Sequence, residues 1–556
     1  RAGAMWYKNA IIYSLDVETF MDGNGDGTGD FQGLIDRIDH LENLGVTCVW
    51  LQPHYPSPNR DDGYDVMDFY GVDPRLGSAG EFAEFSHALK ERGIRLILDL
   101  VVNHTSIEHP WFRRACEDPS SPWRDFYLWA EEKPADADRG MVFPGVQETT
   151  WTWCEQAGAY YHHRFFDHQP DLNITNPAVR QEILRIMGYW LQLGVSGFRV
   201  DAAPFLIEIA DPERAARGER DRRGDGRDAE EERQDEAMFA FLREMHDFLS
   251  WRSGDGVLLA EANVAPDRIR AYFGDGDRMH MLFNFLVNQP MFLAFARQEA
   301  APLIEALRAL PEIPRQGQWA QFLRTHDELD LGRLSEAERR EVFEAFGPEP
   351  GMQLYGRGIR RRLAPMFGND RRRLEMAHSL IFSLPGTQVI RYGDEIGMGD
   401  DLALEDRLAV RTPMQWSDAP NGGFSDAPPD EVFRPVIAGG EYGYAKVNVQ
   451  AQQQDPDSLL NRVEQLIRAR RSCREIGEGT MTLLEVDEPG VLAHRSDGGG
   501  RSVLALHNLA DRPCRVRLES MGGDRLRNLV GNRRYPPAGE AVELDAWGYR
   551  WLRVGR

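Results

Sequence analysis

The sequence predicts an α/β protein whose main part is a (β/α)8 barrel. Short apolar runs alternate with segments of helical spacing from about residue 9 to residue 200, and this alternation is typical of a parallel sheet wound with helices. The 556 residues leave room for such a barrel of ~250 residues or more and for further domains. Strand-like runs lie at residues 10–15, 46–51, 94–102, 197–200, 257–260, 281–285, 319–323 and 388–392.

Helical segments at 31–45 and 79–93 separate the first three predicted strands, but one later connection is much longer. Residues 105–170, after the third strand, are rich in Trp, Pro and His and lack clean periodicity. Connections of that length in compact domains are usually functional. We therefore expect the barrel to occupy residues 1–104 and 171–474, with an inserted subdomain at 105–170.

The character of the chain changes after a last predicted helix at 458–473. From about residue 475, short strand-like runs are separated by Gly, Asp and Pro clusters, which predicts a small antiparallel β-sandwich domain at 475–556. Within the barrel region, residues 211–236 have mixed charge and almost no apolar side chain. We interpret that segment as a mobile, solvated loop.

Composition excludes several classes of partner. The chain has 65 basic and 89 acidic residues, a net charge of −24, which disfavours nucleic acid and anionic membranes. No apolar run approaches the ~20 residues that span a bilayer, and no signal peptide is visible. The cysteines, Cys48, Cys116, Cys154, Cys473 and Cys514, show no CxxC pair, so we expect a reduced cytoplasmic protein with incidental thiols. We also expect a small-molecule substrate and a homo-oligomer.

Three carboxylates lie at or just past the ends of three predicted strands: Asp201, Glu261 and Asp327. In a (β/α)8 barrel the active site is built from residues at that end of several different strands. Hydrolysis or transfer of a glycosidic bond needs a close carboxyl pair, one ionised nucleophile and one proton donor. The pattern therefore predicts sugar chemistry, although any one of these acids alone could be an ordinary loop residue.

Neighbouring side chains indicate a role for each acid. Arg199 precedes Asp201 by two positions, so both point to the same side of the strand, and the cation would keep the carboxylate ionised as a nucleophile requires. Glu261 follows an apolar run, which can raise its pKa and suits a proton donor. His326, beside Asp327, could hydrogen-bond a sugar hydroxyl.

A second candidate site is the sequence DGNGDGTGD at residues 22–30. Oxygen-bearing side chains alternate with glycines, so hard ligands can converge in a sharp turn. The resemblance to an EF-hand loop is partial, because its twelfth position is Gly33 rather than Glu. We expect one hard cation here, and the alternative is a metal-free acidic turn. The candidate ligands are Asp22, Asn24, Asp26, Thr28 and Asp30.

In order along the chain, these motifs resemble those of the α-amylase superfamily, glycoside hydrolase family 13. The similarity runs from about residue 5 to the C-terminus, and its motifs are specific in combination. The stretches that carry it are DLVVNHTS (99–106), QPDLN (169–173), GFRVDAAP (197–204), EAN (261–263) and THDE (325–328).

The resemblance implies a retaining mechanism with Asp201 as the nucleophile, Glu261 as the general acid/base and Asp327 as the transition-state stabiliser. It implies that Tyr64 stacks on the sugar face and that Arg411, paired with Asp65, closes the pocket behind a single glucose unit. The implied substrate-binding residues are Tyr64, Asp65, His104, Phe165, Gln169, Arg199, His326 and Arg411.

Further stretches favour an enzyme that converts maltose to trehalose, because they resemble members of the family with that activity. Hydrolysis of α-glucosides stays open as an alternative, since segment 211–236 replaces a short acceptor-side loop of the family. A non-catalytic scaffold is a remote third possibility. The supporting stretches are RDDGYDV (60–66), YYHHRFFDHQPDLN (160–173), YFGDGDRMHM (272–281), GIRRRLAPMFGNDRRR (358–373), PGTQVIRYGDEIGMGD (385–400) and, shared with α-glucosidases, RTPMQWS (411–417).

The resemblance also implies two structural metal sites. The loop 22–30 would bind Ca²⁺ or Mg²⁺. A second Ca²⁺ would tie the inserted subdomain to the barrel through Asn103, Asp171 and Glu208. The alternative for this second set is that each side chain only hydrogen-bonds a loop.

Overall fold

The computed structural model describes residues 5–143, 145–201, 203, 229–518 and 525–555. Its centre is a closed barrel of parallel strands in the order β1-β14-β10-β9-β8-β7-β3-β2. Each predicted strand supplies one of them, so the predicted fold class is confirmed. The bounds are β1 Ile11–Leu15, β2 Cys48–Leu51, β3 Arg95–Leu100, β7 Gly197–Val200, β8 Val257–Ala260, β9 Met281–Phe283, β10 Gln318–Phe322 and β14 Thr387–Arg391.

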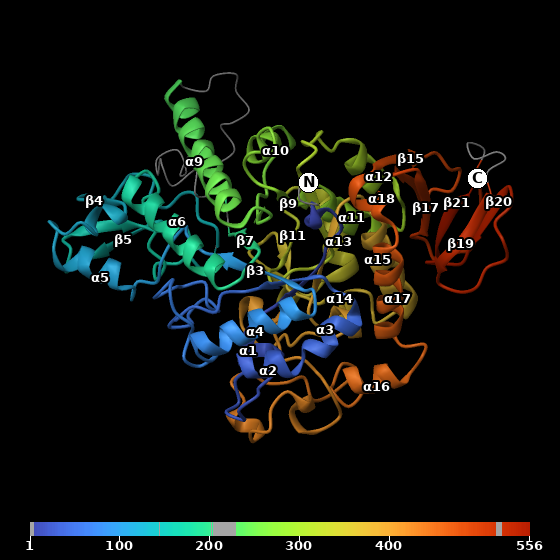
Figure 1. The fold of residues 1–556 in the computed structure, drawn as a ribbon, viewed down its shortest axis with the longest axis horizontal. Helices are drawn as coiled ribbons and strands as arrows, with labels where there is room; N and C mark the ends of the chain where they lie inside the picture. The colour runs from blue at the N-terminus through green and yellow to red at the C-terminus, as the bar shows by residue number, and fades with distance from the viewer. Residues whose placement is uncertain (1–4, 144, 202, 204–228, 519–524, 556) are drawn as a thin grey trace.

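Helices surround the barrel (Figure 1). They begin at ordinary capping residues: Ser78 accepts from the backbone N–H of Glu81 at the start of α4, and Pro177 occupies the first turn of α6. The predicted helix 31–45 is divided in two at Arg37. The main helices are α2 Phe31–Asp36, α3 Ile38–Leu44, α4 Ala79–Glu91, α6 Pro177–Gln192, α9 Ala229–Ser253, α11 Phe285–Arg297, α15 Arg371–Ser383 and α17 Leu459–Arg471.

The insertion after β3 projects to one side of the barrel (Figure 1). It contains helix α5 (Pro110–Glu117) and a small antiparallel sheet in the order β4-β6-β5. The ring of Phe112 packs edge-on against Tyr161 at 5.1 Å, and a β-bridge between His104 and Asp171 joins the two ends of the insertion. The sheet strands are β4 Trp129–Ala130, β5 Trp151–Cys154 and β6 Ala159–His162.

The C-terminal part is an antiparallel β domain, as predicted. A five-stranded sheet in the order β15-β16-β17-β21-β19 faces the pair β18-β20. Apolar side chains from both sheets, including Leu504 and Val542, form one buried cluster between them. The strands are β15 Thr480–Leu484, β16 Val491–Gly498, β17 Arg501–Asn508, β18 Cys514–Arg517, β19 Arg525–Gly531, β20 Ala541–Leu544 and β21 Tyr549–Gly555.

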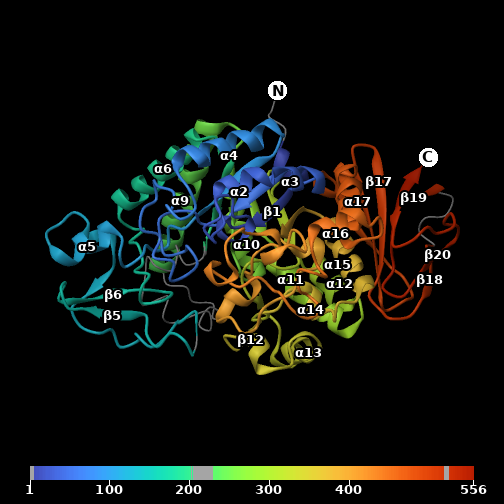
Figure 2. The same cartoon turned by 90° about the horizontal axis from the view of Figure 1, so that it is seen from below.

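Helix α15 forms the seam between the barrel and the C-terminal sheet (Figures 1 and 2). The hydroxyl of Ser379 lies 2.7 Å from His507 Nε2 and accepts a 2.9 Å hydrogen bond from Trp551 Nε1. One turn later, the Ser383 hydroxyl lies 3.4 Å from His494 Nε2. These side chains are buried, so the two domains share one polar network inside their interface.

The sequence predicts a solvated loop at 211–236, and residues 211–228 lie outside the described residues. The expectation is wrong for residues 229–236, because α9 begins at Ala229. Ala, Glu, Arg and Gln dominate that stretch and have high helix propensity, which mixed charge does not oppose. None of the helices within the described ranges combines the length and apolar character that crossing a bilayer demands.

Candidate active site

The three predicted acids meet in one cavity at the C-terminal ends of the barrel strands. Asp201 directly follows β7, Glu261 directly follows β8, and Asp327 lies in the loop after β10. The cavity has a volume of about 390 Å³, which falls within the ~300–1,000 Å³ of small-molecule sites. Predicted residues on its wall are Tyr64, His104, Phe165, Arg199, Asp201, Glu261, His326 and Asp327.

One buried cation contacts two of the three acids. Arg199 Nη1 lies 2.6 Å from Asp99 Oδ1 and 2.8 Å from Asp201 Oδ1, and its Nη2 donates to Glu261 Oε2. Both carboxyl groups therefore contact one guanidinium, and a carboxyl pair held together in this way suits a retaining enzyme.

The environments of the acids separate their pKa values. Burial raises the pKa of Glu261 to about 8. The positive charge of Arg199 lowers this pKa, and the negative charges of Asp201 and Asp327 offset part of that lowering. Burial raises the pKa of Asp201 to about 6, against the lowering effect of the same arginine. Burial also acts to raise the pKa of Asp327, but Arg407 and other neighbours hold it well below its usual range. Glu261 can therefore remain protonated as a proton donor at a pH where Asp201 is ionised as the nucleophile.

We expect a bell-shaped pH dependence of kcat/KM on maltose. Asp201 must be ionised to attack, so the rate falls as the pH drops through about 6. Glu261 must be protonated to donate, so the rate falls again as the pH rises through about 8. Initial rates across acidic and alkaline buffers measure both limbs. A profile that stays flat into alkaline pH would contradict the assignment of Glu261 as the acid.

Tyr64 and His326 form a stacked pair on the cavity wall. Their rings lie 5.4 Å apart and 5° from parallel, and the Tyr64 hydroxyl is 2.8 Å from His326 Nε2. The same hydroxyl donates to Asp99 Oδ2, which also accepts from Trp50 Nε1, each at 3.0 Å. The ring of His104 packs edge-on against Phe165 at 5.3 Å. Rings and hydrogen-bonding groups thus surround the acids, as a sugar-binding pocket requires.

The expected pairing of Arg411 with Asp65 is wrong. Arg411 Nη1 lies 2.9 Å from Asp62 and its Nη2 lies 3.0 Å from Asp327. Asp65 instead accepts from the Ser57 hydroxyl and from backbone N–H groups, which fixes its own loop. Neither Asp65 nor Arg411 lies on the cavity wall. Arg411 therefore braces Asp327 from behind.

Three residues of this region were missed in the sequence. Asp61 lies on the cavity wall, and burial raises its pKa to about 7. It accepts a 2.6 Å hydrogen bond from Gln169, a predicted substrate-binding residue that does not line the cavity. Asp62 holds Arg411. Arg407 lies on the wall 3.2 Å from Asp327. The paired acids of RDDGYDV were the available signal for the first two.

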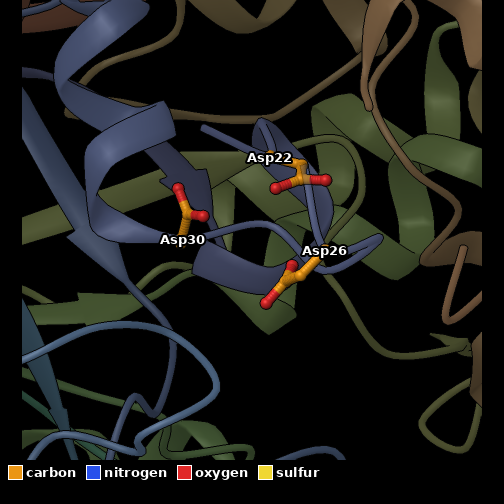
Figure 3. Close-up of side chains that lie close together, drawn as sticks. All are labelled: Asp22, Asp26 and Asp30. Atoms are coloured by element: carbon orange, nitrogen blue, oxygen red, sulfur yellow. The ribbon is translucent and has the colours of Figure 1, made fainter. Parts of the chain in front are cut away.

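Loop 22–30 brings three of its predicted ligands together. Oxygens of Asp22, Asp26 and Asp30 all lie within 4.8 Å of one another, around one turn of the loop (Figure 3). Gly27 is in the left-handed region at φ 93°, and a side chain there would collide with the backbone of Glu431. The donor set and the tight turn fit a hard cation such as Ca²⁺.

The second predicted metal set fits as far as it is described. The side-chain oxygens Asn103 Oδ1 and Asp171 Oδ1 are buried and have no hydrogen-bond partner within the described structure. Their residues are adjacent across the base of the insertion, where Leu172 N–H donates to the Asn103 carbonyl. Two orphaned hard oxygens of this kind are what a bound cation would satisfy. Glu208 lies outside the described residues.

Comparisons with known proteins agree with the geometry. The family model of the alpha amylase catalytic domain matches residues 13–342 and 359–479, and that of the maltogenic amylase C-terminal domain matches residues 481–551. A trehalose synthase of Pimelobacter sp. is 39% identical, over 99% of this chain and 96% of that protein. The trehalose synthase/amylase TreS of Mycolicibacterium smegmatis is also 39% identical, over 99% and 92%.

A solved structure shows the same fold at greater sequence distance. The trehalulose synthase of Pseudomonas mesoacidophila superposes with a TM-score of 0.77 over 100% of both chains, at 24% identity. The catalytic-domain match covers most of the barrel, and the relatives are similar along nearly their full length. The chain therefore belongs to the α-amylase family, glycoside hydrolase family 13.

Proposed function

We propose that this enzyme converts maltose to trehalose by moving a glucosyl unit through a covalent intermediate. The observation that carries the proposal is the Asp201–Glu261 pair, which shares Arg199 and has separated pKa values. The choice of substrate is supported by the full-length similarity to proteins named trehalose synthase. The chemistry follows from the residues on the cavity wall.

In the first step, Asp201 attacks the anomeric carbon of the non-reducing glucose from its β face. Glu261 donates its proton to the glycosidic oxygen, and glucose is released within the cavity. Positive charge develops on the sugar ring in the transition state, and the ionised Asp327 stabilises it. The products of this step are a β-glucosyl ester of Asp201 and a free glucose.

In the second step, Glu261 is a carboxylate and acts as the base. It removes the proton of the anomeric hydroxyl of the retained glucose, whose oxygen attacks the glucosyl carbon and displaces Asp201. Two inversions give overall retention, so the new bond is α. If water enters first, the same intermediate is hydrolysed and two glucose molecules result.

The acceptor side of the cavity carries polar groups that could hold the released glucose. Asn263 and Asp330 lie on the wall, joined by a 3.3 Å hydrogen bond, and Arg357 lies 3.7 Å from Asp330. Arg357 also donates to the carbonyl of Val142 in the insertion at 2.7 Å. The insertion is thereby held over the cavity, where it would hinder water from reaching the intermediate.

We further propose structural metal ions in this enzyme. Asp22, Asn24, Asp26 and Asp30, with Thr28, would hold Ca²⁺ or Mg²⁺ in loop 22–30, and Asn103 and Asp171 would hold Ca²⁺ at the base of the insertion. A bound cation would supply rigidity to these loops. The catalytic steps are carried out by the protein's own side chains.

Chelation is expected to lower the melting temperature by several degrees and to change the initial rate at room temperature much less. Loop 22–30 lies between β1 and α2 and contributes no residue to the cavity wall. A ligand bound only by the folded state stabilises that state. Thermal unfolding with and without EDTA measures the effect, with Asp26→Asn expected to weaken it. Equal melting temperatures in both buffers would refute the proposed metal ions.

The product mixture from maltose tests the proposed function. Trehalose formed without net release of reducing sugar supports it, and isotopically labelled free glucose should not enter the trehalose if the transfer is intramolecular. Glucose as the only product would establish a hydrolase, a possibility favoured by more distant relatives such as a glucan 1,6-alpha-glucosidase of Streptococcus pneumoniae, 29% identical.

We also propose a cytoplasmic homo-oligomer. Light scattering on the same sample measures its oligomeric state.

A further inference from the structure

Two of the five cysteines meet inside the insertion. Cys116 lies in the last turn of α5 and Cys154 is the last residue of β5, 38 positions later. Their sulfur atoms are 3.3 Å apart. Both are free thiols. The sequence shows only scattered cysteines, so this contact exists because the small sheet folds against α5.

The two thiols differ in access. Cys116 is only 4% exposed and packs among apolar and aromatic side chains, whereas Cys154 is partly exposed at the end of its strand. Burial raises the pKa of the Cys116 thiol, and its hydrogen bond with Cys154 raises it further. A dissolved reagent therefore reaches Cys154 first, and Cys116 is placed to react with whatever forms on Cys154.

We propose that Cys116 and Cys154 form a reversible oxidation site that accepts a disulfide bond by exchange with a small disulfide. The Cys154 thiolate attacks one sulfur of the reagent, forms a mixed disulfide and releases one small thiolate. Cys116 then loses its proton and attacks the sulfur of Cys154, which forms the internal bond and releases the second small thiolate. The two protein protons go to solvent, and the two electrons leave on the reduced reagent.

The geometry favours this pair over the other cysteines. A disulfide bond is about 2.05 Å long, so the two sulfurs need to approach by little more than ~1 Å, within the reach of small side-chain rotations. Cys48 lies in barrel strand β2, and Cys514 lies in β18 of the C-terminal domain. The bond would tie α5 to the β5–β6 hairpin, and β6 leads directly to Arg164 and Phe165 on the cavity wall.

The test uses the full-length folded enzyme and oxidised glutathione. After incubation, acid quenches the exchange, N-ethylmaleimide blocks the remaining thiols, and peptide mass spectrometry locates every cysteine. We expect one cross-linked peptide that joins Cys116 to Cys154, reversed by dithiothreitol. The oxidised enzyme should melt a few degrees higher, because the bond closes a long loop of the unfolded chain.

Two variants separate the steps. In Cys116→Ser, Cys154 should retain glutathione as a stable mixed disulfide, while in Cys154→Ser the thiol of Cys116 should stay unmodified. Cys514→Ser, which removes a thiol of another domain, should form the internal bond as the wild type does. Stable glutathione on Cys154 of the wild type, or a cross-link formed only in urea, would overturn the proposal. The wild-type peptide map decides even if a variant folds poorly.

Discussion

Asp201→Asn will abolish turnover of maltose and leave the enzyme folded. The amide cannot form the covalent intermediate, and loss of such a nucleophile costs roughly 10⁴-fold or more in kcat. Burial already raises the pKa of Asp201 to about 6, so its ionised form is disfavoured in the folded state. The folded-state pKa lies above the unfolded value, so ionisation at neutral pH costs stability that a neutral amide does not. The melting temperature should therefore be unchanged or higher.

The control for this variant is an azide experiment that distinguishes the two carboxyl groups. With Asp201→Gly and an activated α-glucoside, azide should take the place of the nucleophile and give the β-glucosyl azide. With Glu261→Gly, the covalent intermediate still forms, and azide should attack it to give the α-glucosyl azide. Opposite anomers from the two variants would support the assigned roles. The same anomer from both, or an active Asp201→Asn, would contradict them.

Arg411→Ala will lower kcat/KM on maltose by about 10²-fold or more. Its guanidinium contacts both Asp62 and Asp327 and donates to the carbonyl of His326. Its removal leaves each acid with one nearby arginine, Arg407 for Asp327 and Arg434 for Asp62, so the buried network is weakened and the enzyme should also lose stability. The pKa of Asp327 should rise as one of its cations is lost. Steady-state kinetics on maltose and a melting curve measure the two effects.

Matched variants distinguish local damage from loss of folding. Arg340→Ala removes an exposed arginine paired with Glu336 and should change neither quantity much. Adding Asp62→Asn to Arg411→Ala removes one buried negative charge that is left with Arg434 alone, so it should recover part of the stability but not catalysis. A pocket braced at this end also predicts an enzyme limited to disaccharides and short α-glucosides. Efficient mid-chain cleavage of starch by the wild type would show an open pocket and contradict that part.

The barrel could be predicted because buried parallel strands leave a direct trace in the sequence. Residues 257–260 are apolar without interruption, since both faces of β8 are covered, and the next residue is Glu261. The position of an acid at the end of such a run follows from the fold itself. The positions of Asp201 and Glu261 therefore did not depend on loop conformation, whereas Asp327 lies in the loop after β10.

The roles of the acids in the turn at residues 61–65 could not be predicted in the same way, because the conformation of that turn decides where each side chain points. Asp61, Asp62 and Asp65 are close together in the sequence, and backbone angles decide their directions. Asp62 and Gly63 both have positive φ, 49° and 89°, so the chain reverses between them. As a result, Asp61 reaches the cavity, Asp62 reaches Arg411, and Asp65 turns back on the loop. No periodic pattern encodes that choice.

Contacts between segments far apart in the chain were even harder to predict from the sequence. Arg407 reaches Asp327 across 80 positions of chain, and its guanidinium lies 5.2 Å from the centre of the Phe143 ring in the insertion. Nothing in the sequence indicates that an arginine 80 positions after Asp327 contacts it. The cysteine pair of the insertion was missed for the same reason.

The seam at α15 makes the C-terminal sheet a structural part of the barrel. Cutting the chain before β15 would strip Ser379 of both His507 and Trp551, and a buried helix face would meet water. Burial also holds the pKa of His507 well below its ordinary value, so the unfolded chain binds a proton there more readily. Stability is thus lost as the pH falls below about 6.5. Heat and mild acid should therefore melt both domains in one cooperative event, and neither should survive as a separately foldable fragment.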